Sequence, residues 1–326
     1  MSAQPESAQI NAAELYRKAY AELSELDADE RKLLDSLKIS ELDPVSASRK
    51  EAFTQLAQRL EPAIKFISEA SKSDQIDWQT QDDPSGWIKI GNSGKSLTRV
   101  MILKARMDIH ENRFEDAANA FIAGMALSRH LGHDGVFMVK LIETASYRMT
   151  VASLAQEIPG FPENVVKNIQ ERLVELPASK TMKEVLQAER HFADQLGRQP
   201  DSVYPEEMMK GFLEFYDQLI ESGHLSPLEF ENQLKALGES YSDNFMIKGA
   251  LPILPNMRHL IAVLEVKTLL FELGLKAQLQ GPEIIDNSKD PFGNGPYEYS
   301  QLANNGFQLS SQLEYRGEKV TLKFGH

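Results

Sequence analysis

Residues 97–132, LTRVMILKARMDIHENRFEDAANAFIAGMALSRHLG, contain the pattern that determines the fold class. The spacing of their apolar residues predicts a helix, a short polar turn and a second helix. Small residues occur where the two helices would approach closely, at Ala105, Ala117, Ala118, Ala120 and Gly124. Because further helices with short polar turns follow, and no Val/Ile-rich strand alternates with them, the sequence predicts a mainly α fold, an antiparallel helical array.

Apolar residues recur at helical spacing along most of the chain. The clearest helix start is Ser226-Pro227 followed by Glu229, which combines an N-cap residue, a proline at the first helical position and a capping box. Further helices are predicted over residues 12–26, 136–158, 162–176, 180–196, 205–222, 227–239 and 255–281, with another that follows Pro44 and holds Leu56, Leu60, Ile64 and Ile67.

Residues 73–96 lack this periodicity and hold both tryptophans of the chain, Trp78 and Trp87, among Asp, Gly and Pro residues. The segment is predicted to be a long loop. Long loops are uncommon unless they are packed or functional, so the two indole rings are expected to pin this loop against the helices. The alternative is that Trp78 and Trp87 line a ligand site.

After Gly281 the apolar spacing changes from the helical period to the alternation of a strand. The alternating residues are Tyr297 and Tyr299, then Phe307, Leu309, Leu313 and Tyr315, then Val320, Leu322 and Phe324. Asn305-Gly306 is a hairpin turn signal, and a second turn is expected at Arg316-Gly317-Glu318. We expect a helical domain over residues 1–280 and a C-terminal three-stranded antiparallel β meander over 281–326, packed on the helix at 255–280.

Composition excludes several classes of function. The chain has 326 residues, and 35 Lys+Arg against 48 Asp+Glu give a formal net charge of −13, which repels nucleic acid and anionic lipid. The most apolar stretch, residues 260–273, carries Glu265, Lys267 and Glu272, so no membrane insertion is expected. Without cysteine there are no disulfides, thiolate nucleophiles, thiolate zinc sites or iron–sulfur clusters.

Two groups of side chains could carry chemistry. Glu143, Glu189 and His191 would form a general acid/base site of a hydrolase if they met in a cleft, and the alternative is a set of ion pairs between helices. A looser, oxygen-lined calcium site is the second candidate, and the alternative there is turn chemistry. Its ligands would be Asp286, Asp290, Asn294 and Glu298. No other cofactor is indicated.

Two short resemblances concern parts of the chain. The hairpin at residues 97–132 resembles one tetratricopeptide-type repeat, with Asn112 at the turn position where glycine is usual. The stretch DPFGNGPYEYS…NGFQLSS resembles the C-terminal β segment of the major pseudopilins of type II secretion. The matching positions are Asp290, Pro291, Phe292, Gly293, Asn294, Pro296, Tyr297, Gly306, Leu309 and Ser311. Those proteins bind calcium in a loop farther along, where this chain has QLEYRGEKV instead.

A wider resemblance covers more of the chain. The segments IDWQTQDDPSGW, LTRVMILKARM, RFEDAANAFIAGMALSRHLG, LIETASYRMTVASLAQEI and LPASKTMKEVLQAERHF follow in this order. They resemble a family of exported helical proteins of planctomycete-type bacteria that has no assigned activity. A Cys-Asp-Trp motif is frequent in that family, and this chain has Ile76-Asp77-Trp78 at the matching place. The resemblance implies a helical fold and export.

Together these patterns favour a non-enzymatic interaction or scaffold protein of the cell envelope that binds a protein partner through a groove or the edge of the sheet. The alternatives are a hydrolase that uses Glu143, Glu189 and His191, and a calcium-stabilised surface assembly protein. The polar stretch at residues 2–9 is of the kind that follows a removed leader or anchor, which would place the protein in the periplasm or cell envelope. A cytoplasmic location is the alternative, and the oligomeric state is left open.

Overall fold

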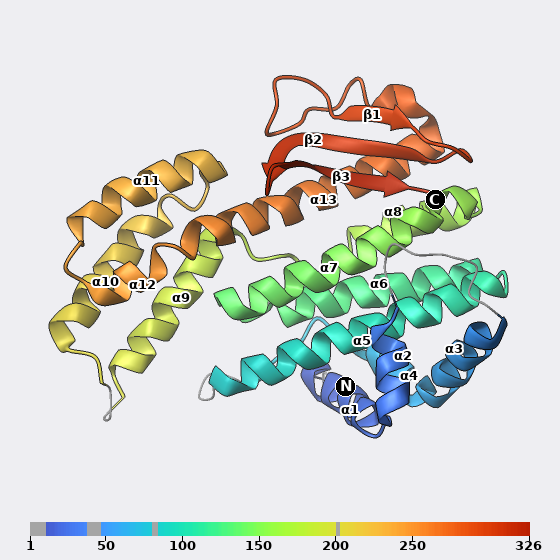
Figure 1. Ribbon diagram of the computed structural model, residues 1–326, viewed down its shortest axis with the longest axis horizontal. Helices are drawn as coiled ribbons and strands as arrows, with labels where there is room; N and C mark the ends of the chain where they lie inside the picture. The colour runs from blue at the N-terminus through green and yellow to red at the C-terminus, as the bar shows by residue number, and fades with distance from the viewer. Residues whose placement is uncertain (1–10, 38–46, 80–83, 200–202) are drawn as a thin grey trace, which may run out of the picture.

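The predicted hairpin forms two long helices, α5 (Pro84–His110) and α6 (Phe114–Leu131), in a computed structural model of the chain. The structure describes residues 11–37, 47–79, 84–199 and 203–326. Helix α7 (Phe137–Glu157) packs on both, and the three helices lie in successive layers at the centre of the molecule (Figure 1). Thirteen α-helices and one three-stranded sheet form in the described ranges, so the predicted fold class is confirmed. The stretch at residues 2–9 lies outside them.

A buried carboxylate holds the turn between α5 and α6. Asp108 is fully buried, and it accepts hydrogen bonds from Lys104 Nζ at 2.6 Å and from Arg113 Nε at 3.0 Å. Asn112 has a φ of 57°, in the left-handed region that asparagine tolerates better than most residues. The turn therefore forms without the glycine that is usual in a tetratricopeptide-type hairpin.

The predicted loop at residues 73–96 is wrong in its second half, because α5 begins at Pro84 and carries Trp87. Gly91 and Gly94 weaken the helix pattern when propensity alone is considered. In the structure, a methyl group at Gly91 would overlap Ile142 of α7, and one at Gly94 would overlap Leu131 of α6. The glycines permit close packing of three helices, and this packing offsets their low helix propensity.

The N-terminal helices pack on α5 and α6. The single helix predicted after Pro44 is in fact two helices that meet at Leu60, because Pro62 is tolerated in the first turn of a new helix but not in a helix interior. A short helix that begins with the capping box of Asp27 and Glu30 was not predicted. The bounds are α1 (Ala12–Ser24), α2 (Ala28–Asp35), α3 (Ala47–Arg59) and α4 (Glu61–Ala70).

Helices α9 to α12 gather beside this stack, at the left of Figure 1. They pack with the first turns of α13 around a hydrophobic cluster of their own, which includes Phe215, Phe230 and Leu254. The six-residue α12 was not predicted, and the others agree with the predicted helices to within a few residues. The bounds are α8 (Glu163–Leu173), α9 (Met182–Gly197), α10 (Glu206–Ile220), α11 (Pro227–Ser240), α12 (Phe245–Ala250) and α13 (Leu254–Gln280).

The C-terminal sheet lies on α13, as Figure 1 shows. Phe324 is fully buried, and its ring stacks on Phe307 at 4.6 Å and on Phe271 of α13 at 6.2 Å between centroids. Lys267 of α13 also donates to the carbonyl oxygen of Thr321. The strands are antiparallel in the order β1 (Glu298–Gln301), β2 (Phe307–Tyr315) and β3 (Glu318–Phe324), with a bulge in β2 between Ser310 and Glu314.

The two turns of the sheet differ in how well they were predicted. The first turn uses Asn304 and Asn305, with φ of 53° and 59°, and not the predicted Asn305-Gly306 pair. Gly306 is needed instead for close approach, because a methyl group there would press on the carbonyl oxygen of Phe324. The second turn has positive φ at Arg316 and Gly317, as the sequence predicts.

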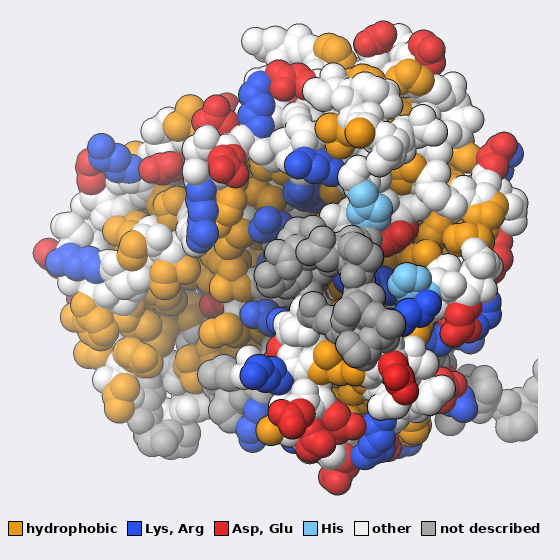
Figure 2. Space-filling model, turned by 45° about the vertical axis from the view of Figure 1, so that its right-hand side comes forward, with side chains coloured by type: hydrophobic (Ala, Val, Ile, Leu, Met, Phe, Trp, Pro, Cys, Tyr) orange, Lys and Arg blue, Asp and Glu red, His pale blue; other side chains and the backbone are white. Residues whose placement is uncertain are grey.

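The surface carries charges of both signs. Figure 2 shows Lys and Arg side chains interspersed with Asp and Glu over one face, while hydrophobic side chains gather in the left half of that view. Among the helices in the described ranges, none has the length and apolar character that crossing a bilayer requires.

Two matched glycine substitutions test the docking of the sheet. A methyl group at Gly274 of α13 would overlap the ring of Phe324, whereas one at Gly249 of α12 would meet no atom within 4 Å. We expect Gly274→Ala to lower the free energy of unfolding by about 2–3 kcal/mol, because the stacked ring must move. Gly249→Ala should raise it by about 0.5–1 kcal/mol. Urea denaturation followed by circular dichroism measures both, and changes of the same sign would contradict this packing.

Candidate functional site

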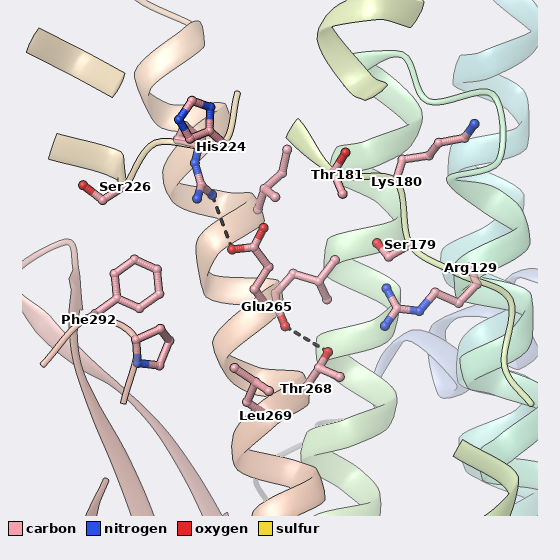
Figure 3. A pocket seen from close by; sticks show the side chains of 14 residues that line it. Arg129, Ser179, Lys180, Thr181, His224, Ser226, Glu265, Thr268, Leu269 and Phe292 are labelled. Atoms are coloured by element: carbon pink, nitrogen blue, oxygen red, sulfur yellow. Dashed lines mark hydrogen bonds and ion pairs between the residues drawn. The ribbon is translucent and has the colours of Figure 1, made fainter. Parts of the chain in front are cut away.

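A pocket of about 590 Å³ lies across α13, and we call it the α13 pocket. Helix α13 forms its floor. Residues 179–181, which precede α9, lie on one side, and residues 224–226 before α11 lie on the other with the loop at 291–292 (Figure 3). The pocket therefore lies where the segments before α9 and α11 and the loop before the sheet meet α13. Its volume is within the range of about 300–1,000 Å³ that is usual for ligand sites.

The floor of the α13 pocket is apolar. Ile261 and Leu264 are buried, while Leu269 remains 40% exposed. The hydroxyl of Thr268 donates to the carbonyl oxygen of Leu264 at 3.0 Å, so its polar atom is already satisfied. An apolar group that covered Leu269 would therefore meet no unpaired polar atom of these residues.

Phe292 is held at the pocket by a buried aspartate. The carboxylate of Asp290 accepts from the Phe292 backbone N–H at 3.0 Å, from the Ser311 hydroxyl at 2.9 Å and from the Gln312 backbone N–H at 2.5 Å. Asp290 is fully buried, so these bonds satisfy a charge that would otherwise be costly to bury. The loop that resembles the pseudopilin segment thus supplies one wall of the pocket.

A buried ionic network lies behind the opposite wall. Glu143 of α7 accepts from Arg129 Nη1 at 2.9 Å, from Lys140 Nζ at 2.8 Å and from the Ser179 hydroxyl at 2.5 Å. Lys140 also donates to the Ser179 hydroxyl. Burial lowers the pKa of Lys140, against the opposing attraction of Glu143. Two basic residues share one carboxylate in this network, next to the pocket.

Two further basic residues with a permanent charge, Lys180 and Arg258, line the pocket. Arg258, only 5% exposed, donates to the carbonyl oxygen of Leu225 at 2.8 Å and pairs with Glu265 at 3.5 Å. Lys180 and His224 lie on opposite sides of α13 (Figure 3). Within the described part of the lining, Glu265 is the one acidic residue. A chain with a net charge of −13 therefore has a local positive region here.

The three predicted catalytic residues lie in different environments. Glu143 is fully buried in the network, and the carboxylate of Glu189 accepts from the backbone N–H of Phe137 at the start of α7. Burial raises the pKa of Glu189 to about 7. His191 is exposed on α9, and no hydrogen bond or ion pair among the described residues joins it to either glutamate. The neighbouring Arg190 instead pairs with Asp217, which ties α9 to α10.

Both tryptophans have packing roles. Trp78 donates from Nε1 to the carbonyl oxygen of His130 at 2.8 Å and stacks on Tyr16, with ring centroids 5.8 Å apart. The Tyr16 hydroxyl in turn lies 2.8 Å from His130 Nδ1, and burial lowers the pKa of His130 to about 4. Trp87 packs edge-on against Phe192. Trp78 also lines a second pocket, of about 270 Å³, so its ligand role stays a prediction.

The four calcium candidates are not grouped around one point. The oxygens of Asp290 accept three protein donors, in the turn role that was the alternative. Glu298 pairs with Lys319 at 2.6 Å and lies on β1, and the hydrogen bond from Lys319 lowers the pKa of Glu298. Asp286 and Asn294 are exposed. In the described ranges, no three acidic or histidine side chains are arranged to hold a metal ion.

Fold and geometry together define a mainly α protein with a ligand-sized, cation-rimmed pocket on one central helix. Comparisons with protein-family models, curated proteins and solved structures give no match for this chain. The resemblances described from the sequence therefore stay predictions, and the function has to be inferred from the pocket itself.

The residues that give the pocket its charge were not predicted from the sequence. Lys140 and Glu143 are three residues apart on α7, a spacing that signals an ion pair on a helix face. Nothing in the sequence indicates that Arg129 and Ser179 join them, because they come from α6 and from the segment before α9.

The pH dependence of the free energy of unfolding tests the burial of Glu189. Its pKa is raised to about 7, so the folded protein binds a proton more tightly than the unfolded chain between about pH 4.5 and 7. The free energy of unfolding therefore falls as the pH rises through that window. Glu189→Gln keeps an acceptor for the Phe137 N–H. The change in free energy of unfolding that it causes, relative to the wild type, should be more favourable at pH 8 than at pH 5 by roughly 1–3 kcal/mol.

Denaturant titrations of both proteins at the two pH values measure this difference. Glu184→Gln on the same helix is the matched control, because hydrogen bonds from Thr181 lower the pKa of Glu184 and its effect on stability should have the opposite sign. An unchanged pH dependence in Glu189→Gln would show that this carboxylate is hydrated rather than buried.

Proposed function

We propose that this protein is a non-enzymatic interaction protein, and that the α13 pocket binds an extended, acidic segment of a partner protein. The observation that carries the proposal is the contrast of charge: a chain with a net charge of −13 places Arg129, Lys180 and Arg258 around one pocket, opposed in its described lining by Glu265 alone. Complementary charge steers association and selects the partner.

The apolar floor supports an interaction rather than a purely electrostatic contact. Leu269 and the half-buried Phe292 offer hydrophobic area between the cationic sides. Burial of apolar area contributes about 25 cal/mol per Å², and a few such anchors usually dominate the affinity of an interface. A partner segment that alternates acidic and apolar residues would satisfy both features of the pocket.

A hydrolytic role for Glu143, Glu189 and His191 has less support. Catalysis by a carboxylate and an imidazole needs both groups within hydrogen-bond reach of a substrate in one cleft. Glu143 is instead occupied by Arg129 and Lys140, while His191 lies on the surface of α9. The proposed location in the cell envelope rests on the resemblance to exported helical proteins.

Peptide binding tests the proposal. The probes are fluorescent octapeptides in which Asp or Glu alternates with Leu or Phe, and the same peptides with Lys in place of the acidic residues. We expect the acidic peptides to bind and the basic ones not to bind, with an affinity that falls as salt is added because the charges are screened. Fluorescence anisotropy measures both. Equal binding of the two sets, or of neither, would contradict the proposal.

A matched pair of variants locates the site. Leu269→Asp puts a negative charge on the pocket floor and should weaken binding at least about tenfold, which corresponds to about 1.4 kcal/mol. Val174→Asp is the control, because Val174 is 87% exposed at the end of α8 and does not line the pocket. Anisotropy titrations should show unchanged affinity for Val174→Asp, and an equal loss in both variants would place the binding elsewhere.

A further inference from the structure

Arg129 is one of the buried cationic residues that line the α13 pocket. The residue is 8% exposed, and its guanidinium lies over the ring of Tyr147 at 4.1 Å. Nη1 donates to Glu143, whereas Nε finds no hydrogen-bond partner among the described residues. Buried polar groups are nearly always paired, and Glu143 does not satisfy all the donors of this pocket-lining arginine.

The network behind Arg129 offers it one hydrogen-bonded carboxylate, which it has to share. Glu143 is shared between Arg129 and Lys140, and Lys140 is fully buried. Burial lowers the pKa of Lys140, against the attraction of Glu143 and of Glu265 in the pocket lining. Glu272, the next carboxylate along α13, has a pKa that burial raises, against the attraction of Lys276 and Arg129. A ligand carboxylate would complete the network.

The surroundings of Arg129 restrict how that carboxylate can be attached. The floor beside it is formed by the buried Ile261 and Leu264, so the atoms next to the carboxylate have to be apolar. An internal Asp or Glu would bring flanking backbone N–H and C=O groups onto these residues, where they would stay unpaired at a cost. A chain terminus carries its carboxylate on the same carbon as its last side chain, and only one strand of backbone has to enter.

We infer that the α13 pocket recognises the free carboxyl terminus of its partner, with the terminal carboxylate on Arg129 and an apolar last side chain over Leu264 and Leu269. This inference rests on the proposed function and specifies the end of the partner segment. The acidic residues that precede the terminus then face Lys180 and His224 at the rim. Ser179 and the start of α9 lie beside the carboxylate, where the helix end favours negative charge.

The test compares acidic hexapeptides that end in Leu, Phe or Val, each made with a free carboxyl end and as the carboxyl amide. We expect the free acids to bind at least about tenfold more tightly than the amides in fluorescence anisotropy. If acids and amides bind equally, the inference is wrong while the proposed function stands. If neither form binds, the proposed function itself fails.

Two variants assign the preference to a residue. Arg129→Lys keeps the charge but removes the fork of donors, so the ratio of acid to amide affinity should fall toward one. Lys180→Ala at the rim is the matched control, and it should weaken both forms by the same factor. Melting curves check that each variant folds. If Arg129→Lys does not fold, the comparison of acid with amide on the wild-type protein still tests the inference.

Competition by small anions distinguishes the recognition of a chain terminus from the binding of any free anion. Sodium acetate and sodium phosphate are titrated against the bound peptide, with sodium chloride at equal ionic strength as the reference. We expect little displacement beyond the salt effect, because these ions lack the apolar side chain that covers Leu269. Displacement by acetate at the concentration of the peptide itself would reduce the site to a general anion site and overturn the inference.

Discussion

The constraint on which the structure depends is that α13 buries apolar residues on more than one face and has to be covered on several sides. Its buried residues include Met257, Val263, Val266, Phe271 and Leu275, which do not fall on a single face. A helix of this kind is stable only in the interior. The chain meets the requirement with α9 to α12 at one end, α7 and α8 along one side, and the sheet along the other.

The α13 pocket is the place where this covering is incomplete. A gap remains over Leu269, where the segments before α9 and α11 and the loop at 291–292 meet α13. A gap lined only by apolar residues would invite non-specific association. Arg129, Lys180 and Arg258 instead surround it with charge. In the proposed function, selectivity for an acidic ligand follows from the same arrangement that leaves the helix open.

Much of the fold could be predicted, because helix and strand periods are local properties of the sequence. The hairpin of α5 and α6 and the strands after Gly281 were found in this way. Errors occurred where tertiary packing overrides local preference, as at Gly91 and Gly94, which are helical because they fit against Ile142 and Leu131. The charge of the pocket could not be predicted, because its ionic network joins α6, α7 and the segment before α9.

The loop before β1 links the C-terminal sheet to the α13 pocket. As a sequence, DPFGNGPY indicates turns, a resemblance and two candidate calcium ligands. In the structure, the carboxylate of Asp290 accepts hydrogen bonds both from Phe292 in its own loop and from Ser311 and Gln312 of β2. The position of Phe292 at the pocket is therefore coupled to the register of the sheet, and the sheet is held on α13 by Phe324. The sheet is thus part of the pocket's framework as well as a cover for the helix.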